Sequence, residues 1–184
     1  MKHFKFFLLA LAMTAMPHAI NAQAQTNAQT TAAEDLDAKY ATELLKPGTE
    51  APEIALNTID GKQFTLKNLR GKYVVLDFWA SWCGPCRAEM PNVKAAYEKY
   101  KGKGFNIVAL SFDNKLENWT KAIEDMQMPW IHLSDLKGWK TVAGQIYGVN
   151  AIPASFLVDP NGTIIAADLR GEKLEAKLKE VYGE

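Results

Sequence analysis

Residues 73–86 decide the fold of this chain, and they read YVVLDFWASWCGPC. The first half, residues 73–79, is a nearly continuous apolar run whose length and β-branched content fit a buried central strand. A helical pattern follows directly over residues 84–101, with Pro85 tolerated in the first turn, and glycines after it predict its end. The motif Cys-Gly-Pro-Cys therefore lies where a buried strand passes into a helix.

The chain has two cysteines, Cys83 and Cys86, and both belong to this motif. The free amides and the positive dipole end of a helix stabilise a thiolate, which is the form that attacks disulfides. This placement makes Cys83 the candidate nucleophile, and a tight Gly84-Pro85 turn leaves Cys86 close enough to resolve a mixed disulfide. A purely structural cross-link is the weaker alternative, because closing a loop of two residues gives little entropic gain.

The composition disfavours metal and nucleic-acid binding. A zinc site usually needs two further Cys or His ligands, and the chain has no second C-x-x-C and no paired histidines. Lysine plus arginine and aspartate plus glutamate number 21 each, so the formal net charge is zero and no basic excess points to nucleic acid. We therefore expect no metal, no nucleic-acid partner, and no cofactor other than a redox-active Cys83–Cys86 disulfide.

Extended and helical patterns alternate along the rest of the chain. Asp60-Gly61 and Asn161-Gly162 are strong hairpin turn signals. The alternation predicts a parallel core, and the late hairpin adds antiparallel strands, which together give an α/β fold with a mixed central sheet and helices on both faces. Strands are expected at residues 53–57, 63–66, 73–79, 105–112, 130–133, 154–158 and 163–167, and helices at 84–101, 116–126, 139–146 and 172–182.

The motif and its surroundings resemble a known family. Residues 78–86, FWASWCGPC, closely resemble the thioredoxin active-site signature. Three further features are similar to the TlpA/ResA-like branch of exported thioredoxins: the segment RAEMP at residues 87–91, the N-terminal hairpin, and an inserted segment at residues 114–138. The resemblance covers about residues 48–183. It implies a thioredoxin-like fold with an N-terminal β-hairpin and a central insertion.

The resemblance also implies where a substrate binds. Ile152-Pro153 is similar to the cis-proline of the family, which faces the two sulfurs and helps to bind an extended substrate. Trp82 is either a substrate contact or a packing residue beside the site. The expected substrate-binding residues are Trp82, Gly84, Pro85, Ile152 and Pro153.

Two carboxyl groups are candidates for managing the protons of the cysteines. Asp77 lies in the apolar strand six residues before Cys83, and Glu89 follows Cys86 by three residues on the same helix face. A carboxyl group in apolar surroundings has a raised pKa and serves as acid or base near neutrality. The family resemblance matches both positions. The lysine that pairs with the buried acid in many thioredoxins is replaced here by Ala109, and the alternative for Glu89 is a solvated helix acid.

The N-terminal residues 1–24 have the features of an export signal. A short basic stretch precedes an apolar run at residues 6–15, and small residues suit cleavage after Ala22 or Ala24. An uncleaved membrane anchor is the alternative, although the run is shorter than the roughly 20 residues of a spanning helix. Residues 25–47 are predicted as a flexible tether with a short helix at 34–45, and residues 48–184 as the thioredoxin-like domain. The protein is thus expected in the periplasm or otherwise exported, where disulfides persist.

These features predict an exported thiol–disulfide oxidoreductase. Gly84-Pro85 is the dipeptide of thioredoxin, a strong reductant at about −270 mV. By resemblance we expect a reductase of exported proteins, with apocytochrome c as one suggested substrate and a membrane electron donor that reduces it again. The alternatives are a disulfide oxidase or isomerase, a peroxiredoxin-like thiol peroxidase, and a binding module without activity. Ala80 stands where a peroxidatic motif has threonine, which disfavours the peroxidase, and the intact cysteine pair disfavours the module.

Overall fold

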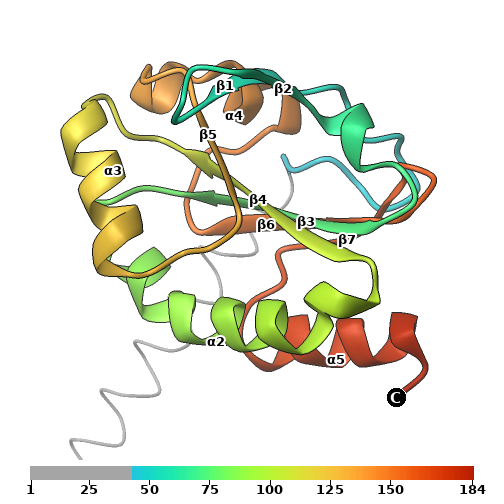
Figure 1. The fold of residues 1–184 in the computed structure, drawn as a ribbon. Coiled ribbons are helices and arrows are strands. Elements are labelled where there is room, and N and C mark those ends of the chain that lie inside the picture. The colour runs from blue at the N-terminus through green and yellow to red at the C-terminus, as the bar shows by residue number, and fades with distance from the viewer. Residues whose placement is uncertain (1–42) are drawn as a thin grey trace, which may run out of the picture. The chain divides into compact units, whose positions relative to one another are not determined.

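The computed structural model describes residues 43–184 (Figure 1). The predicted export signal at residues 1–24 and most of the predicted tether at 25–47 lie outside the described residues. Among the helices of residues 43–184, none is both long enough and apolar enough to cross a bilayer.

A seven-stranded sheet forms the centre of the described part, in the order β2-β1-β5-β4-β3-β6-β7. β4 runs parallel to both β3 and β5, and the other neighbouring strands are antiparallel. The predicted mixed sheet and its N-terminal hairpin are therefore confirmed. The strands are β1 (Ala55–Thr58), β2 (Gln63–Thr65), β3 (Tyr73–Trp79), β4 (Phe105–Ser111), β5 (Ile131–Ser134), β6 (Ala154–Val158) and β7 (Ile164–Ala167).

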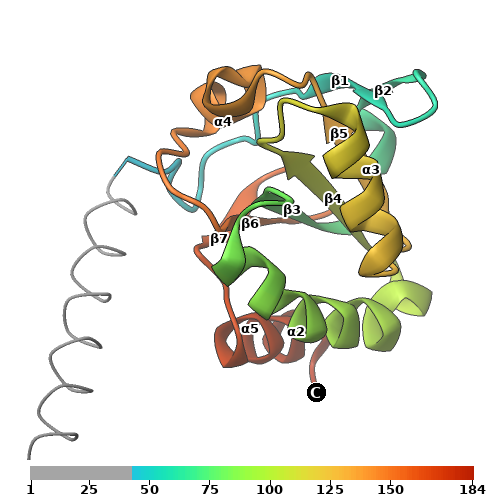
Figure 2. The same ribbon diagram turned by 90° about the vertical axis from the view of Figure 1, so that its left-hand side faces the viewer.

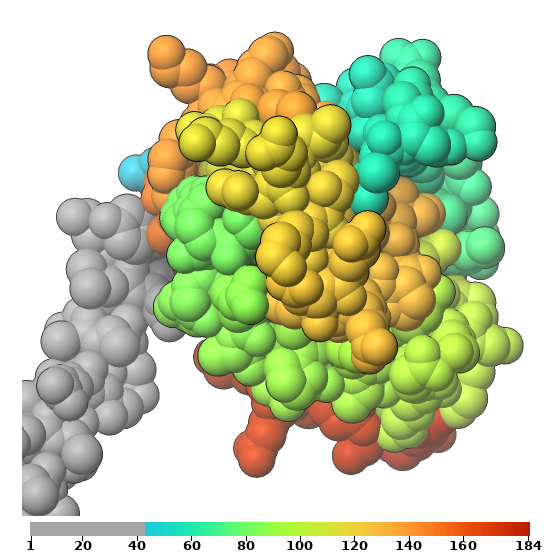
Figure 3. Space-filling model, turned by 60° about the vertical axis from the view of Figure 1, so that its left-hand side comes forward, coloured from blue at the N-terminus to red at the C-terminus, as the bar shows by residue number. Residues whose placement is uncertain are grey.

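Helices cover both faces of this sheet, as predicted (Figure 1, Figure 2). α2 (Gly84–Tyr100) and α5 (Glu172–Tyr182) lie on one face, and α4 (Val142–Tyr147) lies on the other. α3 (Leu116–Asp125) adjoins α2, where Lys94 Nζ donates a hydrogen bond to the Met126 carbonyl oxygen. The green surface of α2 and the yellow surface of α3 meet in Figure 3. Short 3₁₀ helices are η1 (Leu66–Leu69), η2 (Lys101–Lys103) and η3 (Gly138–Lys140).

β3 lies in the interior of the sheet, between β4 and β6, with helices over both faces. This position explains its apolar sequence, because a strand buried on both faces has no polar side to alternate with. Phe78 contacts the rings of Phe112, Tyr147 and Phe156, and its side chain is fully buried. The end of β3, from which the cysteine motif emerges, is therefore held in an aromatic part of the core.

The helix predicted at residues 139–146 is wrong in its bounds, because Thr141 interrupts it. Thr141 is buried and has extended backbone angles (φ −57°, ψ 133°), so it separates η3 from α4. The Asp135 carboxylate accepts a hydrogen bond of 3.1 Å from the Val142 amide. A side-chain acceptor at this place satisfies one of the free amides at a helix start, and it therefore fixes the beginning of α4.

The segment before β1 packs on the domain. Leu44 is buried in the core, and the Leu45 and Gly48 amides donate hydrogen bonds to the Tyr147 and Ile164 carbonyl oxygens. Residues 43 and 44, near the end of the helix predicted at 34–45, form a turn and a bend. The packed structure thus begins before the predicted boundary at residue 48.

Candidate active site

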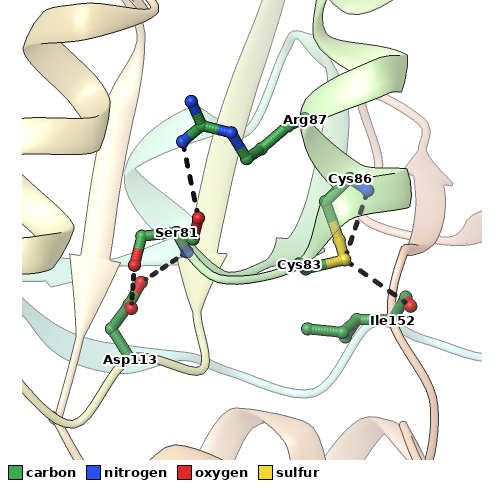
Figure 4. The surroundings of a disulfide bond; sticks show 6 residues. All are labelled: Ser81, Cys83, Cys86, Arg87, Asp113 and Ile152. Carbon is green, nitrogen blue, oxygen red and sulfur yellow. Dashed lines mark hydrogen bonds between the residues drawn. A yellow bond between two sulfur atoms is a disulfide. The ribbon is translucent and has the colours of Figure 1, made fainter.

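Cys83 and Cys86 form a disulfide at the start of α2 (Figure 4). Cys83 occupies the N-cap position, and its Sγ accepts a hydrogen bond of 3.2 Å from the Cys86 amide. Cys83 is 5% exposed, whereas Cys86 is fully buried. The Cys86 amide at the helix start thus points to the sulfur of Cys83, and Cys83 is the less deeply buried of the two cysteines.

The peptide bond between Ile152 and Pro153 is cis, as predicted. The Ile152 carbonyl oxygen lies 3.8 Å from the Sγ of Cys83, and Figure 4 shows it facing the disulfide from the loop before β6. Both residues are half-buried. The loop therefore forms one wall of the surface at which a partner sulfur can approach Cys83.

The other predicted substrate-binding residues are exposed beside the disulfide. Gly84 and Pro85 form the first turn of α2 at the surface, and Trp82 is 54% exposed. Trp82 contacts the ring of Trp139, which is also half exposed and which packs edge-on against Phe112. An apolar surface next to Cys83 is thus made by two tryptophans that are far apart in the sequence, and nothing in the sequence singled out Trp139.

Asp77 lies on β3 with Ala109 of β4 and Ser155 of β6 as its neighbours in register. Its side chain is buried, and its Oδ2 has no hydrogen-bond partner among the described residues. Burial, and to a lesser extent the negative charge of Glu89, raise the pKa of the Asp77 carboxyl from 3.8 to about 7. A carboxyl with this pKa exchanges a proton readily at neutral pH.

Glu89 is half-buried on α2, one helical turn after Cys86. Its Oε1 accepts a hydrogen bond of 2.6 Å from the Gly171 amide, and its Oε2 accepts one of 3.1 Å from Asn92 Nδ2. These bonds fix the carboxylate between α2 and the loop before α5. The structure therefore brings Glu89 within electrostatic range of Asp77, and Glu89 is only partly solvated.

We expect the Glu89→Gln variant to lower the pKa of Asp77. The substitution removes a negative charge that disfavours ionisation of Asp77. The pKa should stay above 3.8, because burial is the larger cause and is unchanged. A ¹³C NMR titration of the Asp77 carboxyl measures the shift. Glu98→Gln, which removes an exposed charge from the same helix, is the matched control, and an equal pKa of Asp77 in all three proteins would contradict the coupling.

The loop between β3 and Cys83 has a partner that the sequence did not reveal. Asp113, two residues after the end of β4, accepts hydrogen bonds from both the amide and the hydroxyl of Ser81 (Figure 4). The only available signal was that β3 and β4 are parallel neighbours, so that the residues following them meet at one edge of the sheet.

Within residues 43–184, no cluster of three or more His, Cys, Asp or Glu side chains is arranged to hold a metal ion. His132 is buried, and its Nε2 lies 3.0 Å from the Met128 carbonyl oxygen. Burial lowers the pKa of His132 to about 4, so the ring is neutral at pH 7.

Comparison with known proteins places this geometry among thiol–disulfide oxidoreductases. ResA of Bacillus thuringiensis subsp. konkukian (strain 97-27), a thiol-disulfide oxidoreductase, is 37% identical over 141 residues, which cover 75% of this chain and 78% of ResA. Thioredoxin-like protein YneN of Bacillus subtilis (strain 168) is 33% identical over 123 residues, which cover 65% of this chain and 69% of YneN.

Solved structures agree. The thioredoxin domain of a thiol-disulfide oxidoreductase from Bacteroides vulgatus superposes with a TM-score of 0.70 at 35% identity, over 74% of this chain and 98% of that domain. A thiol-disulfide oxidoreductase from Bacteroides fragilis NCTC 9343 gives a TM-score of 0.69 at 31% identity, over 72% and 99% of the two chains. The thioredoxin-like fold is therefore confirmed.

The family model described as AhpC/TSA family matches residues 47–167. This range contains the disulfide, the cis-proline and both carboxyl candidates, and it extends over more than half of the chain. The chain therefore belongs to the AhpC/TSA family and is a thiol–disulfide oxidoreductase similar to ResA.

Proposed function

We propose that this protein reduces disulfides of exported proteins. The observation that carries the proposal is the unequal environment of the two sulfurs: Cys83 is at the helix start with an amide donor and solvent access, and Cys86 is fully buried behind it. The accessible sulfur is suited to attack, because the helix start stabilises its thiolate. The buried sulfur is suited to resolve the mixed disulfide, because no third molecule can reach it first.

The reaction takes place in two exchanges. The Cys83 thiolate attacks one sulfur of the substrate disulfide, a bond forms between them, and the other substrate sulfur leaves as a thiolate that takes up a proton. Cys86 then gives its proton to a carboxylate and attacks Cys83, and the second substrate sulfur leaves. Two electrons have passed to the substrate, and the protein holds the Cys83–Cys86 disulfide.

Asp77 is the proposed acceptor of the Cys86 proton. Phe78 contacts Tyr147 of α4, and successive side chains of a strand face opposite sides of the sheet, so Asp77 faces the side that α2 covers. The contribution of Glu89 on α2 to the raised pKa of Asp77 supports a short distance between this carboxyl and α2. Cys86 lies one turn before Glu89 and, like Asp77, it is buried. Glu89 is proposed to hold the pKa of Asp77 near the working pH, so that the proton is taken up and released without a large energetic cost.

The substrate is proposed to bind along the surface next to Cys83. The exposed rings of Trp82 and Trp139 offer apolar contact, and Gly84 and Pro85 are exposed in the first turn of α2 beside Cys83. The loop of Ile152 and Pro153 also borders this surface, with the Ile152 carbonyl oxygen 3.8 Å from the Cys83 sulfur. Such a surface suits an extended or partly unfolded chain, which can present a disulfide together with flanking apolar residues.

Export, partners and the source of electrons belong to the same proposal. Residues 1–24 have the features of a signal that delivers the protein to the periplasm or beyond, or anchors it in the membrane if it stays uncleaved. A membrane electron donor is proposed to reduce the Cys83–Cys86 disulfide after each turnover. No cofactor other than this disulfide is needed, and apocytochrome c is one proposed substrate.

The direction of electron flow can be tested by equilibration with glutathione. We expect a reduction potential much nearer to the value of thioredoxin, about −270 mV, than to that of DsbA, about −120 mV. The expectation rests on the Gly84-Pro85 dipeptide and on the single amide donor that Cys83 has in this structure. A potential close to that of DsbA would mean that the protein oxidises its substrates, and it would overturn the proposed direction.

A thiol peroxidase is the second candidate, since the family model that matches is named for AhpC and TSA. The reduced protein would then consume hydrogen peroxide rapidly as its cysteine pair is oxidised, and it would leave insulin disulfides intact. We expect the reverse: rapid reduction of insulin and slow consumption of peroxide.

A further inference from the structure

Ser81 lies two residues before Cys83, and hydrogen bonds fix all of its polar groups. Its amide donates to Asp113 Oδ2 at 2.9 Å, and its hydroxyl donates to Asp113 Oδ1 at 2.5 Å. Its carbonyl oxygen accepts a hydrogen bond of 3.4 Å from Arg87 Nη1 on the first turns of α2. Figure 4 shows the three residues on the side of the loop away from Ile152.

Asp113 is itself held firmly. It is 1% exposed, and its Oδ2 also accepts a hydrogen bond of 2.7 Å from the Ser111 hydroxyl. The Asp113 amide donates back to the same hydroxyl at 2.9 Å. The two residues end β4 and follow it, so the carboxylate is attached to an interior strand of the sheet.

The position of Asp113 follows from the pairing of β3 with β4. Trp79 and Ser111 are the last residues in register, and the Phe112 amide continues the ladder with a hydrogen bond of 2.8 Å to the Trp79 carbonyl oxygen. Two residues beyond each strand end are Ser81 and Asp113. The carboxylate therefore fastens the active-site loop to the neighbouring strand, independently of the disulfide.

We propose that Asp113 is a positioning residue that keeps the loop of residues 80–83 in one geometry in both the disulfide and the dithiol state. In the disulfide state the bond between the two sulfurs also restrains this loop. When that bond is broken, the bonds from Asp113 to Ser81 remain. Cys83 thus stays at the helix start, with Cys86 in reach.

The consequence is chemical as well as structural. The tendency of two thiols to close into a disulfide depends on how often they meet, and a loop that is held in place keeps their effective concentration high. Loss of the Asp113 carboxylate should release the loop mainly in the dithiol state. Closure then becomes less favourable, so the reduction potential rises and the mixed disulfide with a substrate resolves more slowly.

The test compares Asp113→Ala with Asp113→Asn and Ser81→Ala in the full-length protein. For Asp113→Ala we expect the equilibrium constant for disulfide closure against glutathione to fall about tenfold, which corresponds to about 30 mV. Asp113→Asn should stay within about twofold of the original protein, because the amide oxygen can accept from the Ser81 amide and the amide nitrogen can donate to the Ser81 hydroxyl. Ser81→Ala, which loses one bond, should lie between them.

Glu53→Ala is the matched control for a general loss of stability. The Glu53 carboxylate also accepts backbone amide bonds, from Ile54 and Leu66, but beside the hairpin of β1 and β2 at the far edge of the sheet. The Glu53→Ala substitution should lower the melting temperature and leave the reduction potential unchanged. The same pattern for Asp113→Ala would overturn the proposal, since it would show a merely structural role.

A second outcome would also overturn it. In this outcome Asp113→Asn shifts the potential as much as Asp113→Ala and also lowers the pKa of Cys83, which is measured by the pH dependence of its reaction with iodoacetamide. Such a result would show that the charge of Asp113, and not the loop position it imposes, controls the potential. If Asp113→Ala does not fold, the potential of Ser81→Ala decides in its place: a rise supports the proposal, and an unchanged value overturns it. The proposed reductase function depends on the absolute potential of the original protein, whereas this proposal depends on the difference in potential between the variants and the original protein, so failure of one is distinct from failure of the other.

Discussion

A Cys86→Ser variant should accumulate as a mixed disulfide with its substrates, and a Cys83→Ser variant should not. Cys83 has an amide donor on its sulfur and access to solvent, whereas Cys86 is fully buried. Without the resolving thiol the first exchange still takes place, but the second cannot. Turnover in insulin reduction should fall by more than about a thousandfold in either variant, as is usual when a reacting group is removed.

Non-reducing gels of an envelope fraction, with mass spectrometry of the captured proteins, measure the trapped species. The double variant Cys83→Ser with Cys86→Ser is the control and should capture nothing. Equal capture by the two single variants would show that the roles of the cysteines are wrongly assigned. The captured proteins would also identify the substrates and test the proposed part in cytochrome c maturation.

Asp77→Asn is expected to give the second-largest effect, and it should act on stability and activity in opposite directions. In the folded protein the pKa of Asp77 is about 7, against 3.8 for an unperturbed group. The folded state therefore binds more protons than the unfolded state between these pH values, and the free energy of unfolding falls as the pH rises from about 4 to 7. The loss due to Asp77 is up to about 4 kcal/mol above pH 7, at 1.36 kcal/mol for each pKa unit.

Asparagine cannot ionise, so this loss disappears in the variant. Asp77→Asn should equal the original protein in stability near pH 4 and exceed it at pH 8. Urea unfolding of the disulfide form at the two pH values measures the difference. Asp125→Asn, an exposed acid on α3, is the control and should show no such pH-dependent gain.

Activity should change in the other direction. Substrate release should be about a hundredfold slower in Asp77→Asn, which is at the low end of what a positioned proton acceptor contributes. The rise in rate that accompanies ionisation of Asp77 near pH 7 should also be lost. An Asp77→Asn protein with the original pH profile would remove Asp77 from the reaction, whatever its effect on stability.

Much of the fold could be predicted because its signals are local. The apolar run of β3 coincides with the observed strand Tyr73–Trp79, and α5 coincides with the predicted range 172–182. The hairpin signals at Asp60-Gly61 and Asn161-Gly162 also stand at observed turns, where both glycines have positive φ. In each case one period of hydrophobicity or one turn residue is enough, because neighbours in sequence determine the conformation.

The helix near residue 140 could not be predicted correctly for the opposite reason. The pattern around Trp139 is helical by itself, but Thr141 is buried in an extended conformation and the Asp135 carboxylate starts α4 at Val142. The ring of Trp139 is held against Phe112, which follows β4. Tertiary contacts therefore outweigh the local preference at this place.

The sequence by itself determined where the reactive groups lie, because it puts a sulfur pair at a strand-to-helix junction with two acids nearby, and its resemblance to thioredoxins added the proline. Only the tertiary structure decided how that chemistry is controlled. Ser81 and Asp113 are 32 residues apart, and Glu89 and Gly171 are 82 apart, yet each pair is joined by hydrogen bonds. The pairing of β3 with β4 sets the first contact, and the packing of α2 beside α5 sets the second. The hydrophobic pattern of the sequence does not reveal such contacts, because they depend on which elements become neighbours in space and not on which residues are neighbours in the sequence.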